Sequence, residues 1–253
     1  MSPTPTRIQS VSRAAALLEH VAQDPAGCTA GDAARALAVP LSTAYHLLNT
    51  LVDAGFLAKS EAKRYQLGTR IGILAEAFLA QVSAPQHLIE HVRDLAHTTG
   101  ETAYLSAWRN GDAMLLCVIE GSRAVRVAGL HLGYAGATHA RASGKVLLAS
   151  RPKGTLERYL ASHDVGALAA PAAVDALRVE LERVRKQGYA LDVEQFSEGV
   201  VCIAAPVADG TLALGISTPA ERYQAMKDEL VAAVVSSAAR APSLAPVPIE
   251  RAS

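Results

Sequence analysis

The stretch Leu41-Ser42-Thr43-Ala44-Tyr45-His46-Leu47-Leu48-Asn49-Thr50-Leu51 decides the fold of the first part of the chain. Advancing about 100° per residue along a helix separates its side chains into two groups. The apolar arc consists of Ala44, Leu47, Leu48, Leu51 and Val52. The opposite face carries Ser42, His46, Asn49 and Thr50, with Thr43 and Tyr45 at its flanks.

This polar face has no carboxylate before Asp53. Small donors and acceptors without negative charge are typical of a helix that reads base edges between phosphates. An ordinary solvated face, the alternative interpretation, usually carries Glu and Lys in quantity. The pattern therefore favours a DNA-recognition helix with contacts from Ser42, Thr43, Tyr45, His46 and Asn49.

The surrounding sequence predicts two earlier helices and a following hairpin. Ser10 is the expected N-cap of the first helix, and Thr29 is the expected N-cap of the second, with Asp32 in a near capping box. Gly55 closes the third helix, which begins at about Leu41. Two short strands, 56–59 and 64–67, come next. Three helices and a β-hairpin are the order of a winged helix-turn-helix.

The predicted hairpin carries a cluster of positive charge. Lys59, Lys63 and Arg64 lie within six residues and are candidate phosphate or minor-groove contacts. Charged hairpin tips are also common on surfaces that bind nothing. Thr29 completes the set of candidate DNA contacts.

Beyond the hairpin the sequence predicts a linker helix and then a mixed α/β region. We expect a DNA-binding domain over 7–68, a linker helix over 69–82, a second domain over 83–241 and a disordered tail over 242–253. Turn signals at Asn110-Gly111-Asp112 and Asp209-Gly210 predict two strand pairs in the second domain. The fold class is therefore α+β.

Composition narrows the range of functions. The chain has 253 residues, 50% of them hydrophobic, and a formal net charge of zero, which by itself neither indicates nor excludes nucleic acid. Its three cysteines contain no CxxC pair, which argues against a disulfide framework or a structural zinc cluster. It has neither an apolar run of the roughly 20 residues that a membrane helix needs nor an N-terminal signal peptide. We expect a cytoplasmic protein without a membrane-bound part and without a cofactor.

Several segments together resemble the IclR family of bacterial transcription regulators. They are Ile8–Val11, Leu41–Leu51, Gly55–Leu57, Arg64–Gly68, Ala142–Ala149 and Val184–Asp192, followed by Glu194, Gly199 and Cys202–Val207. The resemblance covers about residues 7–240 and implies a winged helix-turn-helix, a linker helix and a GAF-like effector-binding domain. It also implies homodimers, or dimers of dimers, bound to double-stranded operator DNA. Leu41 and His46 depart from the family, whose members often have basic residues there.

The resemblance also implies an effector pocket in the second domain. The matching positions are Val125 and Ala128 on a strand, Ala142, Ser143 and Gly144 at a helix start, Asp192, Cys202, Gly215 and Ser217. A helix opening at Ser143-Gly144 would offer free amides to a carboxylate, so we expect a small organic or aromatic acid. From the residues alone, the favoured interpretation of Asp192 is a turn or cap residue and that of Cys202 is plain core, and only the resemblance favours the pocket.

An enzyme is the principal rival interpretation. The segment Gly215–Pro219 lacks the closing glycine of a serine-hydrolase elbow, and Gly144-Lys145 lacks the rest of a phosphate-binding loop. Cys202 has no basic neighbour in sequence that would activate its thiol. His87 and His91 have zinc-compatible spacing without a third ligand, and solvated histidines are the commoner case. We therefore expect no catalytic residue and no metal. A purely effector-sensing or protein-interaction module is the second rival, and a DNA mobility-shift assay separates it from a regulator.

Overall fold

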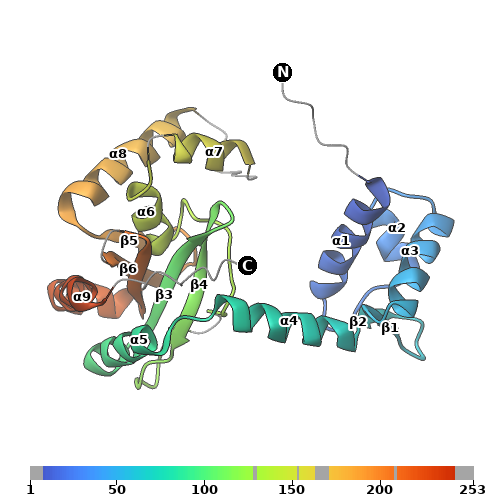
Figure 1. Cartoon of the computed structure of the whole chain (residues 1–253), viewed down its shortest axis with the longest axis horizontal. Helices are drawn as coiled ribbons and strands as arrows, with labels where there is room; N and C mark the ends of the chain where they lie inside the picture. The colour runs from blue at the N-terminus through green and yellow to red at the C-terminus, as the bar shows by residue number, and fades with distance from the viewer. Residues whose placement is uncertain (1–7, 128–129, 153, 163–170, 208–209, 243–253) are drawn as a thin grey trace, which may run out of the picture. The chain divides into compact units, whose positions relative to one another are not determined.

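The computed structural model describes residues 8–127, 130–152, 154–162, 171–207 and 210–242. The chain divides into two compact units between Gln81 and Val82, and each unit is described by itself (Figure 1). Of the expected disordered tail, 242–253, only residue 242 is among the described residues. The predicted effector residue Ala128 also lies outside them.

The first unit is a winged helix-turn-helix. It consists of α1 (Gln9–Ala22), α2 (Ala30–Ala36), α3 (Leu41–Asp53), β1 (Leu57–Lys59) and β2 (Tyr65–Leu67). Its core contains Leu17 from α1, Ala33 from α2 and Leu48 from α3. Tyr65 is 1% exposed and pairs its backbone with Cys28, so the second wing strand also holds the start of α2.

Two helix boundaries test the predicted caps. The Thr29 capping box is confirmed, since its hydroxyl and the Asp32 carboxylate each accept from the other residue's backbone N–H. The Ser10 cap is wrong: Ile8 is the N-cap of α1, and Ser10 lies inside the first turn. Gly55 has φ +75° directly after α3, the left-handed conformation that a helix end favours.

The second unit is built on a five-stranded antiparallel sheet of order β4-β3-β7-β6-β5. Its strands are β3 (Thr102–Arg109), β4 (Asp112–Ile119), β5 (Ala190–Val193), β6 (Val200–Val207) and β7 (Leu212–Pro219). Helices α5 (Gln86–Thr99) and α9 (Ala220–Arg240) pack on one face. On the other face lies α6 (Ala142–Ala149), with α7 (Thr155–Ser162) and α8 (Pro171–Gln187) beyond it (Figure 1). Together with the first unit this gives the predicted α+β class.

The sheet differs from the sequence prediction in detail. Asn110 and Gly111 both have positive φ, as the predicted tight turn between β3 and β4 requires. Strand β5 was not predicted. Val125 was expected on a strand, but it lies in irregular backbone after β4. Helix α6 begins at Ala142, one residue before the predicted Ser143-Gly144 opening.

Candidate DNA-binding surface and effector pocket

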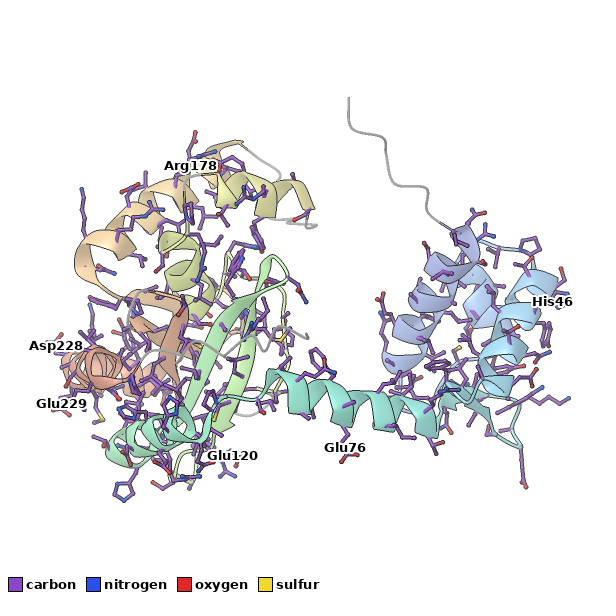
Figure 2. All side chains as sticks on the ribbon, viewed as in Figure 1. His46, Glu76, Glu120, Arg178, Asp228 and Glu229 are labelled. Atoms are coloured by element: carbon purple, nitrogen blue, oxygen red, sulfur yellow. The ribbon has the colours of Figure 1, made fainter. Side chains whose placement is uncertain are left out.

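The exposed face of α3 carries most of the predicted base-reading residues. Ser42, Tyr45, His46 and Asn49 are exposed and Thr43 is half-buried, whereas Ala44, Leu48 and Leu51 are buried in the core. His46 lies on the side of the helix turned away from α1 (Figure 2). No acidic residue occupies the first turn of α3. The face therefore presents an amide, an imidazole and hydroxyl groups without a negative charge before Asp53.

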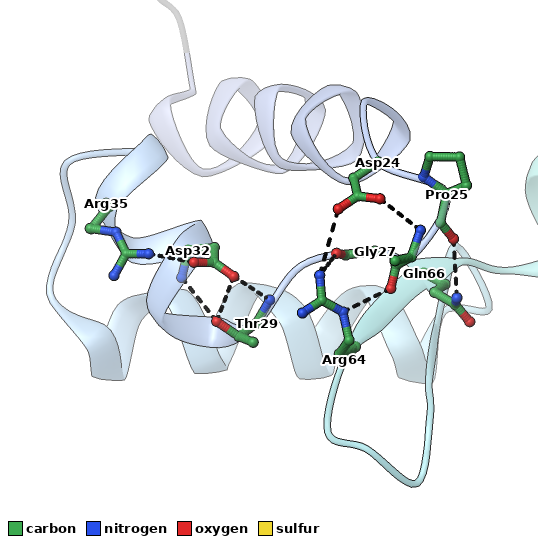
Figure 3. A network of polar contacts seen from close by, with 9 residues as sticks. Asp24, Pro25, Gly27, Thr29, Asp32, Arg35, Arg64 and Gln66 are labelled. Atoms are coloured by element: carbon green, nitrogen blue, oxygen red, sulfur yellow. Dashed lines mark hydrogen bonds and ion pairs between the residues drawn. The ribbon is translucent and has the colours of Figure 1, made fainter.

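Thr29 lies at the start of α2 with its hydroxyl already engaged (Figure 3). Its Oγ1 donates to Asp32 Oδ2 at 2.7 Å and accepts from the Asp32 N–H at 3.2 Å. The hydroxyl bond to Oδ2, together with the Thr29 backbone N–H that donates to the same oxygen at 2.9 Å, lowers the pKa of the Asp32 carboxyl. The hydroxyl thus stabilises the helix start, and any contact of Thr29 with DNA remains a prediction.

Arg64 occupies a different place from the one expected of a phosphate contact. Its Nε donates to the Ala26 carbonyl at 2.9 Å, and its Nη2 donates to the Gly27 carbonyl (Figure 3). Asp24 lies 3.7 Å from the same Nη2. The guanidinium therefore ties the wing to the turn between α1 and α2. This is a structural role that the sequence did not indicate.

Lys59 and Lys63 are the cations that the wing leaves exposed. Lys59 Nζ lies 5.3 Å from the centroid of the Tyr65 ring, a cation–π contact within the strand pair next to the hairpin loop. Lys63 sits at the tip with φ +57°, in the turn closed by its N–H on the Ser60 carbonyl. Their side chains are available to phosphates.

In the second unit, three of the predicted effector residues form a row across neighbouring strands. Asp192 of β5 pairs with Cys202 of β6, and Cys202 pairs with Ser217 of β7. Cys202 Sγ lies 3.1 Å from Ser217 Oγ. Burial, and then the nearby Asp192 carboxylate, raise the pKa of Cys202 to about 12. The thiol therefore stays protonated at neutral pH and is unsuited to nucleophilic attack.

Tyr104 is a residue of this site that the sequence analysis missed. It is 3% exposed on β3 and pairs with Gly215 of β7. A Cβ on Gly215 would lie 2.7 Å from the Tyr104 hydroxyl, so only glycine leaves room for the ring. The phenol also interacts with the Cys202 thiol. The sequence signal that could have indicated Tyr104 is an aromatic residue on a predicted strand that could pair with the strand of the candidate glycine, Gly215.

The start of α6 is buried and tightly packed. Ser143 is 2% exposed, and Arg141, another residue that was not predicted, is the N-cap without a side-chain cap bond. The first N–H groups of a helix have no intrahelical partner, so this end can receive an anion. A Cβ on Gly144 would lie 2.0 Å from the Thr138 carbonyl oxygen. The preceding loop packs so closely against this position that only glycine fits there.

Asp192 behaves as the turn residue that the sequence offered as an alternative. Its Oδ1 accepts from the Gln195 N–H at 2.9 Å and from the Phe196 N–H at 3.2 Å. Burial raises its pKa, and these two donors oppose the rise. Fully buried Lys145 holds the same loop, since its Nζ donates to Gln195 Oε1 at 2.6 Å, to the Leu191 carbonyl at 2.9 Å and to Glu180 Oε1 at 2.7 Å.

The structure does not bring every predicted residue into this cluster. Val125 is 67% exposed, and its carbonyl accepts from Arg222 Nη2 at 3.0 Å. It is therefore not the apolar wall that was expected. The residues that share the α6 face of the sheet, or the α6 start above it, are Ala142, Ser143, Gly144, Asp192, Cys202, Gly215 and Ser217.

A groove of about 820 Å³ lies elsewhere, along α7 and α8. Its lining includes Leu156, Arg178 and Arg183 and none of the predicted effector residues. Arg178, which Figure 2 labels, pairs there with Glu157 at 2.7 Å. The groove is open to solvent along charged helix faces. The buried polar residues that were predicted to bind an effector lie instead at the α6 start and on the sheet face beside it.

The described residues contain neither a metal-binding cluster nor a helix that could span a membrane. Within the described parts of the chain, no three His, Cys, Asp or Glu side chains lie close enough to hold a metal ion. His91 Nε2 lies 3.3 Å from the Arg240 carbonyl, joining α5 to the end of α9. No helix among the described residues is long and apolar enough to cross a membrane.

Comparison with known proteins identifies both units. Residues 10–61 match the IclR helix-turn-helix domain, and residues 79–244 match the bacterial transcriptional regulator IclR C-terminal domain. The chain is 32% identical over 238 residues to the glycerol operon regulatory protein of Streptomyces coelicolor, covering 90% of this chain and 92% of that protein. It is also 32% identical over 239 residues to the regulator BhcR of Paracoccus denitrificans, covering 89% and 85%.

Solved structures show the same fold. The IclR of Thermotoga maritima superposes with a TM-score of 0.64 at 23% identity, over 92% of this chain and 96% of that one. An IclR homologue of Microbacterium hydrocarbonoxydans, solved with 4-hydroxybenzoate, gives 0.63 at 22% identity over 90% and 98%. The two relatives compared by sequence are named as an operon regulatory protein and a transcriptional regulator. The chain belongs to the IclR family of bacterial transcription regulators.

Proposed function

We propose that this regulator is a repressor that occupies operator DNA with α3 in the major groove. The observation that carries the proposal is the exposed polar face of α3, which has no carboxylate before Asp53. Repression requires only that the protein hold the operator against RNA polymerase, and this face supplies the reading surface. The proposed contacts are Ser42, Thr43, Tyr45, His46 and Asn49 on the bases, and Thr29, Lys59 and Lys63 on the backbone.

Arg64 takes a supporting part in this proposal. Its guanidinium holds the wing against the 24–27 turn, so the wing lysines keep a fixed place relative to α3. A fixed wing lowers the conformational entropy that DNA binding costs.

The DNA-bound form is a homodimer, or a dimer of such dimers, on a pseudo-palindromic operator. Helix α4 (Thr69–Val82) has no buried residue, and its Ile73, Leu74 and Phe78 are 66%, 51% and 39% exposed. An apolar helix face of this kind is stabilised by a second copy. Two copies of α3 would then enter successive major grooves, one helical turn apart.

The effector is a small organic acid or a single-ring aromatic acid, bound between the start of α6 and the sheet. The buried groups of Ser143, Cys202 and Ser217 support a compact, mostly apolar site with a few polar donors. A family member of the same fold was solved with 4-hydroxybenzoate, a single-ring acid. We propose that such an acid lowers operator affinity, with a coupling of about 1–3 kcal/mol. The linker helix carries the change in half-site spacing.

A mobility-shift assay on the DNA upstream of the chain's own gene tests the proposal, in the cytoplasmic range of pH and salt. We expect a specific complex that weakens when 4-hydroxybenzoate or pyruvate is added. Equal binding to upstream and random DNA would contradict the regulator's specificity for that site. A specific complex that no acid changes would contradict the effector part alone.

A further inference from the structure

Arg141 stands out because it buries a positive charge at the centre of the second unit. It is 6% exposed and is the N-cap of α6. Burying a charged group is costly unless hydrogen bonds or an opposite charge compensate for it. The guanidinium keeps its proton in any folded protein near neutral pH, although burial lowers its pKa.

The compensation that the protein itself provides is incomplete. One Nη2 donates to the Ala113 carbonyl, and the guanidinium lies 5.0 Å from the centroid of the Tyr134 ring. Its Nε is buried and has no hydrogen-bond partner among the described residues. Asp112 interacts with Arg141 electrostatically, but its Oδ1 already accepts from Thr138 Oγ1 and, at 2.8 Å, from the Ala113 N–H.

The unused donor lies where an anion would be favoured. Arg141 is the N-cap of α6, so the first N–H groups and the positive end of the dipole of this helix directly follow it in the chain. The charge of Arg141 also acts to lower the pKa of the Tyr104 phenol and of the Cys202 thiol, so both groups lie within electrostatic reach of the guanidinium. A second buried donor on that face, the Ser106 hydroxyl, has no partner either among the described residues.

We propose that Arg141 is the carboxylate receptor of the effector pocket, with its Nε–H and the first N–H groups of α6 sharing the two carboxylate oxygens. The inference rests on the proposed function and makes it specific: the pocket selects a carboxylate over a neutral analogue of equal shape. Tyr134 covers the guanidinium and meets Phe196 edge-on, with ring centroids 5.9 Å apart. These two rings form the outer rim against which the body of the acid packs.

The chain contains a matched control for this inference. Arg151, just after α6, also has a buried Nε without a hydrogen-bond partner among the described residues, and its Nη2 donates to the Gly210 carbonyl at 3.1 Å. It lies at the opposite end of the same helix, where the dipole disfavours an anion. Both arginines therefore have an Nε–H without a partner among the described residues, but only Arg141 lies at the N-terminus of α6, beside the proposed pocket.

The test measures acid binding to the full-length protein by calorimetry. The probes are 4-hydroxybenzoate and pyruvate, each paired with its neutral amide, 4-hydroxybenzamide and pyruvamide. The wild type is expected to bind at least one of the acids about 10- to 100-fold more tightly than its amide, the effect of a charged hydrogen bond. Whichever acid binds shows whether the effector is a single-ring aromatic acid or a short keto acid. Arg141→Met is expected to abolish the preference for the acid, Arg141→Lys to retain part of it, and Arg151→Met to leave it unchanged.

A second readout does not depend on affinity. In NMR spectra of the wild type, the Nε–H resonance that disappears in Arg141→Lys is expected to shift when the acid is added, and the Arg151 resonance is expected to stay. This keeps the inference testable if Arg141→Met fails to fold, which circular dichroism would reveal. Acid binding that Arg141→Met leaves unchanged, or an Arg141 resonance that does not move, would overturn the inference while the effector pocket stands. A wild type that binds neither acid would overturn both.

Discussion

The Nε–H of Arg64 donates to the Ala26 carbonyl at 2.9 Å, although the two residues are 38 positions apart in the sequence. Arg64 directly precedes β2, so the bond joins the wing to the turn that separates α1 from α2. With the bond to Gly27 and the ion pair to Asp24, it makes the wing part of the helical scaffold. The wing thus has a fixed position before it meets DNA.

Replacement of Arg64 is therefore expected to act on stability. Arg64→Ala should lower the free energy of unfolding by about 1–2 kcal/mol, since it removes charged hydrogen bonds to two partly covered carbonyls. Urea unfolding measures this change. Lys63→Gln is the control, and it should retain the stability of the wild type. It should weaken binding to operator DNA and to random DNA by the same factor. The slope of log affinity against log salt should fall by about one. An Arg64→Ala protein of unchanged stability would contradict the structural role.

Asn49 tests base reading by α3. Asn49→Ala should weaken binding to the specific operator by about 1–3 kcal/mol, with little change on random DNA, because an amide can pair with the edge of one base. Quantitative mobility shifts on both DNAs measure the difference. Thr50→Ala serves as control, since the Thr50 hydroxyl already donates to the His46 carbonyl at 2.8 Å. Equal losses on both DNAs would exclude base reading by Asn49.

The apolar surface of α4 tests the dimer. Leu74→Glu or Phe78→Glu places a charge in the proposed contact between copies and should shift the protein towards monomers. Sedimentation velocity measures the shift. Glu76→Gln is the matched control on the same helix, with an exposed side chain that Figure 2 labels. Should the glutamate variants sediment like the wild type, the contact between copies lies elsewhere.

Cys202 gives a pH dependence with a definite sign. Its pKa is raised from the ordinary 9.0 to about 12 in the folded protein, so above about pH 9 the unfolded chain releases a proton that the folded one keeps. The stabilisation from Cys202 is complete below that pH and is lost as pH rises towards about 12. The stability difference between wild type and Cys202→Ala should therefore shrink from about pH 8 to about pH 10 in urea unfolding. A constant difference would show that the thiol ionises in the folded protein.

Much of α3 could be predicted because its information is local. The 3.6-residue period separated buried Ala44 and Leu48 from exposed His46 and Asn49, and Gly55 marked the helix end. The turn at Asn110-Gly111 was predictable for the same reason, since few residues adopt positive φ at two successive positions.

Features that depend on distant partners could not be predicted in this way. A lone Arg64 gives no sign of the carbonyls that it meets in the folded protein. Strand β5 has only four residues, and its place is set by pairing with β6. Tyr104 reaches the pocket because β3 lies beside β7, where Gly215 makes room for its ring. The exposure of Val125 depends on the backbone path after β4.

The three bonds of Lys145 have a consequence for how this regulator can be retargeted as a biosensor. One ammonium joins α6, α8 and the loop after β5, so a change at Lys145 would loosen all three at once. Tyr134 and Phe196, at the rim of the proposed pocket, are 36% and 40% exposed and can vary at little cost to folding. A library that diversifies these two aromatics and keeps Lys145 should yield sensors for new acids on an intact scaffold.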